Sequence, residues 1–450
     1  MALGTQSLAL YSAAMKEFYL PGLESELYAS TVLLDLFSKK GRKSGEFTEK
    51  DTDGKYVVKF IKTGRSVGVG ARAETARLPA PGYPEFNAAK FKPARLWARG
   101  SVYGSVLDNT EAGMDYLAKA TADLKEGLKL DINRQLHGDG SGLLATCVSA
   151  SDSGGKTTIT LLTQANAGSA SPAVTNSKLW NGVQYLKGWE GRQVHVLLRS
   201  TGAVNSVGVA GDEDTSLTID SVDETNNTVT LSGTVAAAGS ITTDYGIYVA
   251  GVWTSTAGSG KTTEMYGLGA IIATGNPGFG TDDNGYYGGI NRSTVPTWKS
   301  NVMSNSGVLR SVSQDLIQQA FDTLDVRIGG KPTVVVGQHA MIRQCANLLL
   351  PDRRYVPEPV LEGGWTGFKW NGVPFVPDRD APPHTLRFID GEDAELLRER
   401  PLDVRDHDGN FLERVANYNR YTFDVYATWQ LGSYCPACHL ELADLSMSPA

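Results

Sequence analysis

The longest regular pattern of apolar and polar positions in the chain runs over residues 110–138. Apolar residues recur there at intervals of three and four: Met114, Leu117, Leu124, Leu128, Ile132 and Leu136. Charged residues occupy the opposite side, so the segment is predicted to form one amphipathic helix. Asp108 or Thr110 can cap its start, and His137 followed by Gly138 marks its end. At 1.5 Å per residue the helix is about 40 Å long, which suits a rigid support for other parts of the chain.

Other segments also carry local patterns that predict helices. Residues 23–40 repeat apolar residues at helical spacing. Residues 306–328 do the same, with these residues on the apolar side: Leu309, Val312, Leu316, Ile317, Ala320, Phe321 and Leu324. The sequence PTVVVG (332–337) is predicted to be a strand and HAMIRQCANLLL (339–350) a helix. This alternation is typical of a mixed sheet covered by helices.

Two strand-like segments precede the long helix. They are KYVVKFIK (55–62) and KFKPARLWARGSVYGSVL (90–107), with the proline-rich LPAPGYP (78–84) between them. Proline cannot donate to a strand ladder, so the tip is expected to be irregular. The pattern predicts a long two-stranded arm with exposed edges.

The charge of the chain is unevenly distributed along this predicted arm. Residues 55–107 hold ten basic and two acidic residues, a net charge of +8, whereas the whole chain has a formal charge of −7. The rest of the chain therefore carries a net charge of −15. An isolated two-stranded ribbon is only marginally stable in water, so an arm this basic is expected to rest on an acidic partner surface.

Residues 147–260 form a second distinct region, rich in Thr, Val, Gly, Ser and Asn. Short strand patterns alternate with turn residues, which predicts a small β-barrel or sandwich. The patterns are TTITLLT, RQVHVLLR, TSLTIDSV, NTVTLSGTV and YGIYVAG. Between residues 200 and 260 there are seven acidic residues and neither Lys nor Arg. The region is thus an acidic β-rich module.

Further strands are predicted in the last part of the chain. They include the apolar MYGLGAIIATG (265–275), residues 375–389, and the alternating residues 415–442. The last of these is expected to pair beside earlier strands and return the chain to the long helix.

Composition limits the class of protein. With 41% hydrophobic and 20% charged residues the chain resembles an ordinary globular protein. It has no apolar run of about eighteen residues, so no membrane partner is expected. Its start lacks the positive charge of a secretory signal. Four cysteines do not make a disulfide scaffold, and a reducing compartment is consistent with them.

Several short motifs suggest chemistry, but none has the context that the chemistry needs. AGSGKT and SGGKT lack the first glycine of a phosphate-binding loop. Gly64, Ser66 and Gly68 have the spacing of a nucleophile elbow, but no helical pattern follows. CPACH (435–439) could be a thiol pair, half of a zinc site or a haem attachment sequence, and structural cysteines are the favoured interpretation. The histidines are scattered. The sequence therefore predicts no catalytic, cofactor or metal site.

The order of these elements is similar to that of one family. The chain resembles the major capsid proteins of tailed bacteriophages, which have the Hong Kong 97-like fold. The resemblance covers nearly the whole chain and depends mainly on FNAAKFKPARLWARGSVYGSVLDNTEAGMDYL (86–117) and GGINRSTVPTW (288–298). It also includes SQDLIQQAFDTL, KPTVVVGQHAMIRQ and YTFDVYATWQLG.

The resemblance implies an α+β Hong Kong 97-like fold with seven parts. These are an N-terminal arm (1–45), an extended loop (46–109), a peripheral domain with the spine helix (110–146), a β-barrel-like insertion domain (147–260), a peripheral to axial connection (261–296), an axial domain (297–400) and a return to the peripheral domain (401–450). The extended loop would lie on a neighbouring subunit. Its basic residues are then candidate inter-subunit contacts: Lys59, Lys62, Arg65, Arg72, Arg77, Lys90, Lys92, Arg95 and Arg99.

The function implied by the resemblance is structural. Copies of the chain would assemble as hexamers and pentamers into the icosahedral head that encloses double-stranded DNA, in the host cytoplasm and then in the virion. Scaffolding, portal and decoration proteins are further candidate partners, and contact with DNA would be non-specific. The alternative is a β-rich surface or tail adhesin in which the acidic module is the functional part. A third possibility is an enzyme that uses the CPACH segment.

Overall fold

The computed structural model describes residues 31–39, 52–53, 56–64, 68–74, 77, 82–104, 110–199, 217–235, 239, 241–253, 262–278, 285–328, 330–348, 360–361, 365–366, 368–404, 412–415 and 418–447. The α-helices are α2 (Val32–Lys39), α4 (Thr110–His137), α5 (Gln164–Ala167), α6 (Leu268–Ile271), α7 (Gln314–Ile328) and α8 (His339–Leu348). Short 3-10 helices are η2 (Ser177–Leu179), η5 (Tyr287–Gly289), η6 (Pro296–Trp298) and η8 (Pro436–Cys438). None of these helices combines the length and the apolar character needed to cross a membrane.

The strands divide into five groups. A three-stranded sheet holds β1 (Thr52–Asp53), β2 (Tyr56–Lys62) and β3 (Phe86–Phe91). A four-stranded sheet holds β18 (Ala394–Val404), β20 (Arg420–Ser433), β19 (Glu413–Arg414) and β4 (Ala94–Tyr103). A six-stranded sheet has the order β11 (Asn301–Met303), β21 (Leu440–Leu442), β17 (Leu386–Ile389), β12 (Val334–Gly337), β16 (Val373–Pro377) and β15 (Phe368–Trp370). The strands β13 (Val360–Leu361) and β14 (Trp365–Thr366) pair with each other, and the remaining six form a barrel.

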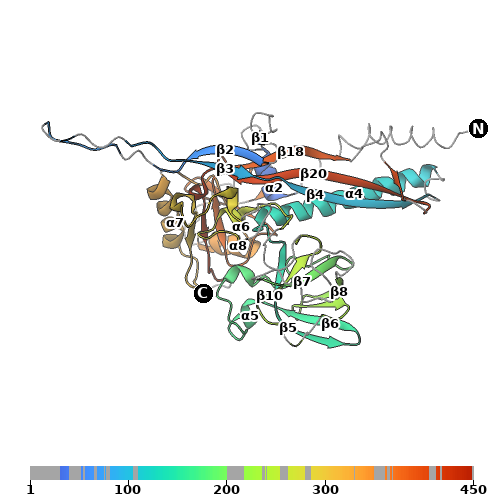
Figure 1. Cartoon of the computed structure of the whole chain (residues 1–450). Coiled ribbons are helices and arrows are strands. Elements are labelled where there is room, and N and C mark those ends of the chain that lie inside the picture. Colours follow the sequence, from blue (N-terminus) through green and yellow to red (C-terminus); the bar gives the residue numbers. More distant parts are fainter. Residues whose placement is uncertain are drawn as a thin grey trace, which may run out of the picture.

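The predicted long helix is confirmed as α4, which has 28 residues. Beside it, β4 and β20 run together to one end of the molecule (Figure 1). At Gly100 a Cβ atom would lie 2.4 Å from the Phe423 ring and 2.9 Å from Leu124, so only glycine lets the helix and the sheet approach this closely. The helix therefore supports the four-stranded sheet along its length.

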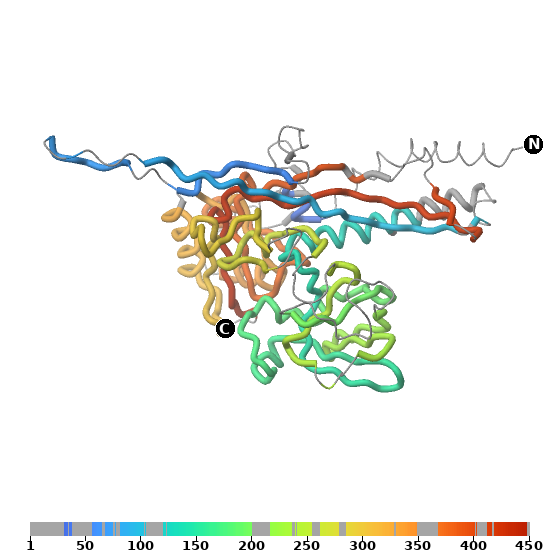
Figure 2. The backbone as a smooth tube through the Cα atoms, viewed as in Figure 1, coloured from blue at the N-terminus to red at the C-terminus, as the bar shows by residue number. Residues whose placement is uncertain are grey.

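The prediction that residues 90–107 form the second strand of the arm is wrong for most of this segment. β2 pairs with β3, but the chain leaves this hairpin at Lys92 and Pro93, and β4 then pairs with β20. Pro93 has no backbone N–H to continue the ladder. The hairpin is thus shorter than residues 55–107 suggest. Between β2 and β3 the described residues lead away from the rest of the molecule, at the end opposite to that of α4 (Figure 2).

The predicted mixed sheet covered by helices is confirmed. In the six-stranded sheet β12 runs parallel to β16 and antiparallel to β17. Its side chains alternate between two cores: Val335 packs with α7 and α8, while Val334 and Val336 pack with the core around the end of α4. A strand buried on both faces explains the unbroken run of valines.

Two element predictions near this sheet are corrected. The helix predicted for residues 306–328 begins only at Gln314, because Ser306 and Gly307 have positive φ angles of 56° and 81° and Ser313 caps the helix through Leu316 N–H. The predicted strand 265–275 is instead the short helix α6. There Gly267 packs so closely on the end of α4 that a Cβ would lie 2.2 Å from the carbonyl oxygen of Gln135.

The predicted β-rich module is a closed antiparallel barrel of β5 (Leu143–Ser153), β6 (Lys156–Leu161), β9 (Thr228–Ser232), β8 (Leu217–Asp223), β7 (Gln193–Leu198) and β10 (Tyr245–Val249). All five predicted strand patterns are found, and β5 is an additional strand that begins before residue 147. Inward residues such as Ile159 and Val229 alternate with less buried ones along β6 and β9 and fill the interior, whereas residues 194–197 of β7 are all buried.

The CPACH segment does not continue a strand. β20 ends at Ser433, η8 follows, and Cys435 and Cys438 form a disulfide across this turn. The other two cysteines, Cys147 and Cys345, are free and buried. The disulfide differs from the reducing compartment with which the cysteine count is consistent, and a structural role for Cys435 and Cys438 stays a prediction.

Candidate functional site: the basic hairpin and its base

The hairpin of β2 and β3 has two faces that differ in burial. In an antiparallel pair, residues opposite each other point to the same side. Val57 lies opposite Phe91 and both are buried, whereas Phe60 lies opposite Ala88 and Lys62 opposite Phe86. The first set forms the inner face of the hairpin and the second set forms its outer face.

The inner face rests on an aromatic cluster. The ring centroid of Phe91 lies 5.4 Å from that of Tyr287 and 5.9 Å from that of Tyr434. Gly288 has a φ angle of 64°, and a Cβ there would lie 3.3 Å from Phe91 and 3.2 Å from Trp298. The glycine next to the GINRSTVPTW segment thus brings this backbone against the hairpin. Burial of these rings fixes the base of the hairpin to the body of the subunit.

The outer face exposes two large aromatic side chains. Phe60 is 78% exposed and Phe86 is 60% exposed. Lys62 and Lys90 lie on the same face of the strands. Exposed aromatic residues beside cations are a common composition of protein contact surfaces. Sequence reasoning did not find them, although β2 has apolar residues at both alternating positions, which is the pattern of a strand covered on both faces.

The nine predicted contact residues do not form a single cluster. Lys59, Lys62 and Lys90 lie on the hairpin, Arg72 and Arg77 lie between its strands, Lys92 follows it, and Arg95 and Arg99 lie on β4. Arg65 lies outside the described residues. All the others are exposed except Lys92, which is half-buried.

Lys59 and Arg99 have partners within the chain that bear on their role. The Lys59 Nζ atom lies 3.6 Å from the centroid of the Tyr434 ring, on the inner face of the hairpin. Arg99 Nε lies 3.2 Å from Asp424 Oδ1, directly across the pair of β4 and β20. These two residues therefore have structural interactions inside the subunit.

A second group of polar residues lies buried where α4 ends. The His137 Nε2 atom lies 3.2 Å from Asp378 Oδ2, and Asn133 Nδ2 donates to Asp380 Oδ2 at 2.7 Å. Nearby, Arg387 Nη1 donates to the carbonyl oxygen of His137 at 2.8 Å. This buried network joins the end of the long helix to the six-stranded sheet.

The buried carboxylate of Glu441 also connects the barrel to this junction between α4 and the six-stranded sheet. Glu441 on β21 pairs with Arg387 at 3.0 Å and with Lys178 of η2, in the loop after the first two barrel strands. Burial of the Glu441 carboxyl acts to raise its pKa, but the charges and hydrogen bonds of Lys178 and Arg387 outweigh it, so the pKa lies below its ordinary value. The barrel, the sheet and the helix are held in one body.

A testable consequence concerns acid stability. Because the pKa of Glu441 is lower in the folded than in the unfolded chain, its stabilising effect is complete above about pH 4.5 and is lost as the pH falls through the folded value. In urea unfolding at a series of pH values, Glu441→Gln should show a shallower acid dependence than wild type. It should also lose about 3 kcal/mol at neutral pH, since the buried Arg387 loses the carboxylate that pairs with its charge. The exposed Glu413→Gln is the control and should keep the wild-type dependence.

One constellation has the residue types of a hydrolase but not the arrangement. Ser433, His439 and Asp393 lie together, yet His439 is fully buried and the Ser433 hydroxyl donates to Asp393. His439 Nδ1 accepts from the Asp390 N–H at 3.2 Å, so its Nε2 donates to Asp393 at 3.0 Å. Both nitrogens of the imidazole are therefore engaged in hydrogen bonds, so the ring cannot accept the serine proton and activate Ser433. Among the described residues no group of three or more His, Cys, Asp or Glu could hold a metal ion.

Comparison with solved structures returns chains from phage and GTA particles. A chain of the Cyanophage A-1(L) capsid asymmetric unit is similar with 12% identity over 88% of this chain and 89% of that one, at a TM-score of 0.46. A chain of the capsid of a native GTA particle is similar with 10% identity over 94% and 90%, at 0.42. A chain of the satellite phage P4 procapsid including size determination (Sid) protein is similar with 10% identity over 95% and 99%, at 0.39.

Comparisons at the level of sequence give no match. No family model matches the chain, and neither does any curated protein.

Proposed function

We propose that this chain is a shell-forming structural protein, the major capsid protein of a tailed bacteriophage. Copies would assemble as hexamers and pentamers into an icosahedral head around double-stranded DNA. The observation that carries the proposal is the hairpin of β2 and β3, whose outer face exposes Phe60 and Phe86 away from the subunit body. A projecting ribbon with exposed aromatic residues needs a partner surface, and a second copy of the chain supplies one in a symmetric assembly.

The remaining architecture supports the same proposal. A 28-residue helix, a sheet with a 14-residue strand and buried polar junctions give a rigid plate that can hold contacts at fixed positions. The barrel would be the insertion domain, and its acidic segment could meet a neighbouring subunit or a decoration protein. In this proposal the six-stranded sheet with α7 and α8 belongs to the axial domain. Scaffolding and portal proteins would be further partners, and DNA contact would be non-specific.

A measurement of particle size tests the proposal. The purified full-length protein is expected to give megadalton particles or capsomers by light scattering, and closed shells or rings in electron micrographs. A monodisperse small oligomer at high protein concentration would instead favour the alternative, a β-rich adhesin in which the barrel is the functional part.

A further inference from the structure

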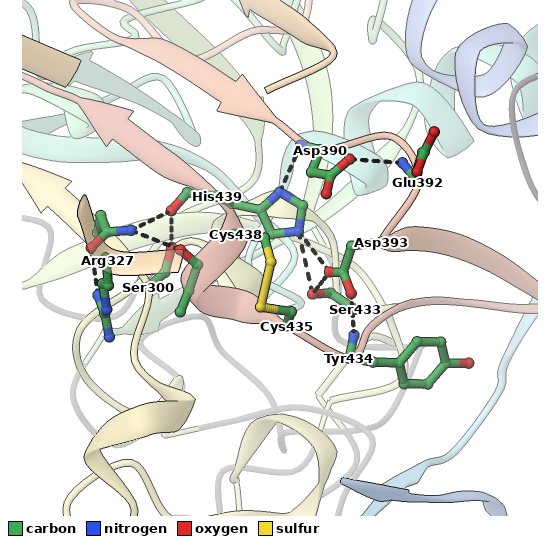
Figure 3. Close-up of a disulfide and its surroundings, with 12 residues drawn as sticks. Ser300, Arg327, Asp390, Glu392, Asp393, Ser433, Tyr434, Cys435, Cys438 and His439 are labelled. Atoms are coloured by element: carbon green, nitrogen blue, oxygen red, sulfur yellow. Dashed lines mark hydrogen bonds and ion pairs between the residues drawn. A yellow bond between two sulfur atoms is a disulfide. The ribbon is translucent and has the colours of Figure 1, made fainter. Parts of the chain in front are cut away.

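The turn between β20 and β21 connects the two large sheets and contains the Cys435–Cys438 disulfide (Figure 3). β20 lies within the four-stranded sheet and β21 within the six-stranded sheet. The Cα atoms of the two cysteines are 5.4 Å apart. The chain also passes between these sheets from β17 to β18, so a rotation of one sheet against the other would strain both connections.

The residues before the disulfide are fixed to the hairpin side. Tyr434 N–H donates to Asp393 Oδ1 at 3.2 Å, and its ring contacts Lys59 of β2 and Phe91 of β3. A movement of Cys435 would therefore displace the base of the hairpin.

The residues after Cys435 are fixed to the six-stranded sheet. Asn301 Nδ2 on β11 donates to the carbonyl oxygen of Ala437 at 2.8 Å. The hydroxyl of Ser300 donates to the carbonyl oxygen of His439 at 2.8 Å, and Arg327 of α7 bonds to the side chain of Asn301. The disulfide thus joins a cysteine on the hairpin side to a cysteine on the sheet side.

The disulfide can be reached from solvent. Both cysteines are partly exposed, and Cys435 lines an open hollow of about 410 Å³ at the base of the hairpin. Lys62 also lines this hollow, and its positive charge favours the approach of an anionic thiolate. Buried Cys147 and Cys345 lack such access.

We propose that Cys435 and Cys438 form a reversible redox site for small thiols, which clamps the hairpin base to the six-stranded sheet when oxidised and releases it when reduced. A thiolate such as that of glutathione attacks Cys435 Sγ, the bond between the cysteines breaks, and Cys438 leaves as a thiolate that takes up a proton. A second thiolate then attacks the glutathione sulfur of the mixed disulfide. This step releases oxidised glutathione and the Cys435 thiolate.

The backbone of the turn makes the reaction reversible. Cys438 N–H donates to the carbonyl oxygen of Cys435 at 2.7 Å, and His439 N–H donates to that of Pro436 at 3.2 Å. These bonds do not include the sulfur atoms, so they can re-form after the turn has opened and bring the two thiols back together for reoxidation. This inference is independent of the proposed function, because it concerns the single subunit.

The test uses the full-length protein in oxidised and reduced glutathione buffers. Alkylation by iodoacetamide and mass spectrometry should find Cys435 and Cys438 unlabelled in the first buffer and both labelled in the second, with Cys147 and Cys345 unlabelled in both. Amide hydrogen exchange in β2, β3 and residues 434–440 should be faster by about tenfold or more after reduction. Exchange in the barrel strands β6 and β9 should not change.

A double variant, Cys435→Ser with Cys438→Ser, is the matched control. It should exchange at the hairpin base as fast as reduced wild type, and glutathione should have no effect on it. Labelling of both cysteines without reductant, or equal hairpin exchange in the two buffers, would overturn the proposal. The wild-type measurements decide this alone if the variant does not fold.

Discussion

Replacing Phe60 and Phe86 together by glutamate is expected to abolish assembly while each subunit remains folded. The two side chains are largely exposed in the single subunit, so their loss removes little packing within it. The hairpin stays attached through its inner face, where Val57, Ala89 and Phe91 are buried. In a contact between copies each aromatic ring is expected to contribute roughly 2 kcal/mol, which is about thirtyfold in an association constant.

Sedimentation and electron microscopy measure the loss of particles, and thermal unfolding of the unassembled subunit measures its stability. The matched control is Phe60→Leu with Phe86→Leu, which keeps an apolar outer face and should still assemble. Normal particles from the glutamate variant would show that this face of the hairpin makes no contact that assembly needs.

The structure also refines which charges can act between copies. The sequence assigns a net +8 to residues 55–107, but Arg99 lies opposite Asp424 and Lys59 lies over Tyr434. Both interactions are internal. Among the described residues the exposed cations Lys62, Arg72 and Arg77 lie on or beside the projecting part of the hairpin. A role in contacts between copies therefore stays a stronger prediction for them than for Lys59 and Arg99.

Local periodicity was sufficient to predict the elements whose burial pattern is regular. α4 has one apolar side that meets the sheet, and the barrel strands β6 and β9 alternate between buried and less buried residues, so the sequence records their burial directly. The same holds for β12, whose valines face two cores.

The errors come from interactions between distant residues. Nothing near Ala94 indicates that its strand pairs with β20 more than 300 residues later, and only the break at Pro93 separates it from the hairpin. The apolar run around Leu268 predicts a strand but forms the short helix α6, because a short apolar run does not distinguish strand from helix. The close approach of Gly267 to the end of α4 decides its conformation.

The candidate site was predictable only in part for the same reason. Its basic residues are visible in the sequence, but which of them face outward depends on the register of β2 and β3. The exposure of Phe60 and Phe86 follows from that register. The disulfide was missed because the alternation around CPACH concealed the turn at Pro436, where the chain passes between two sheets.

Replacing Arg292 by methionine is expected to cause the largest loss of subunit stability, about 5 kcal/mol. The side chain is almost fully buried and its guanidinium donates to four backbone carbonyl oxygens, those of Trp298, Gly275, Ala270 and Ile271. Burial lowers the pKa of Arg292 to about 10, which leaves it charged at neutral pH. Methionine has similar length but no donor, so the carbonyls of the buried residues Trp298, Ala270 and Ile271 lose their partners at roughly 1–3 kcal/mol each.

Urea unfolding of the purified variant measures this effect, with Arg379→Met as the control because the Arg379 side chain is 65% exposed. Arg292→Lys should be intermediate, since an ammonium group keeps the charge but cannot reach carbonyls in the directions of the planar guanidinium. Trp298 and Tyr287, which flank Arg292, also support Phe91 at the hairpin base. The methionine variant should therefore show faster hydrogen exchange in β3 than in the barrel, and wild-type stability would mean that these carbonyls find other donors.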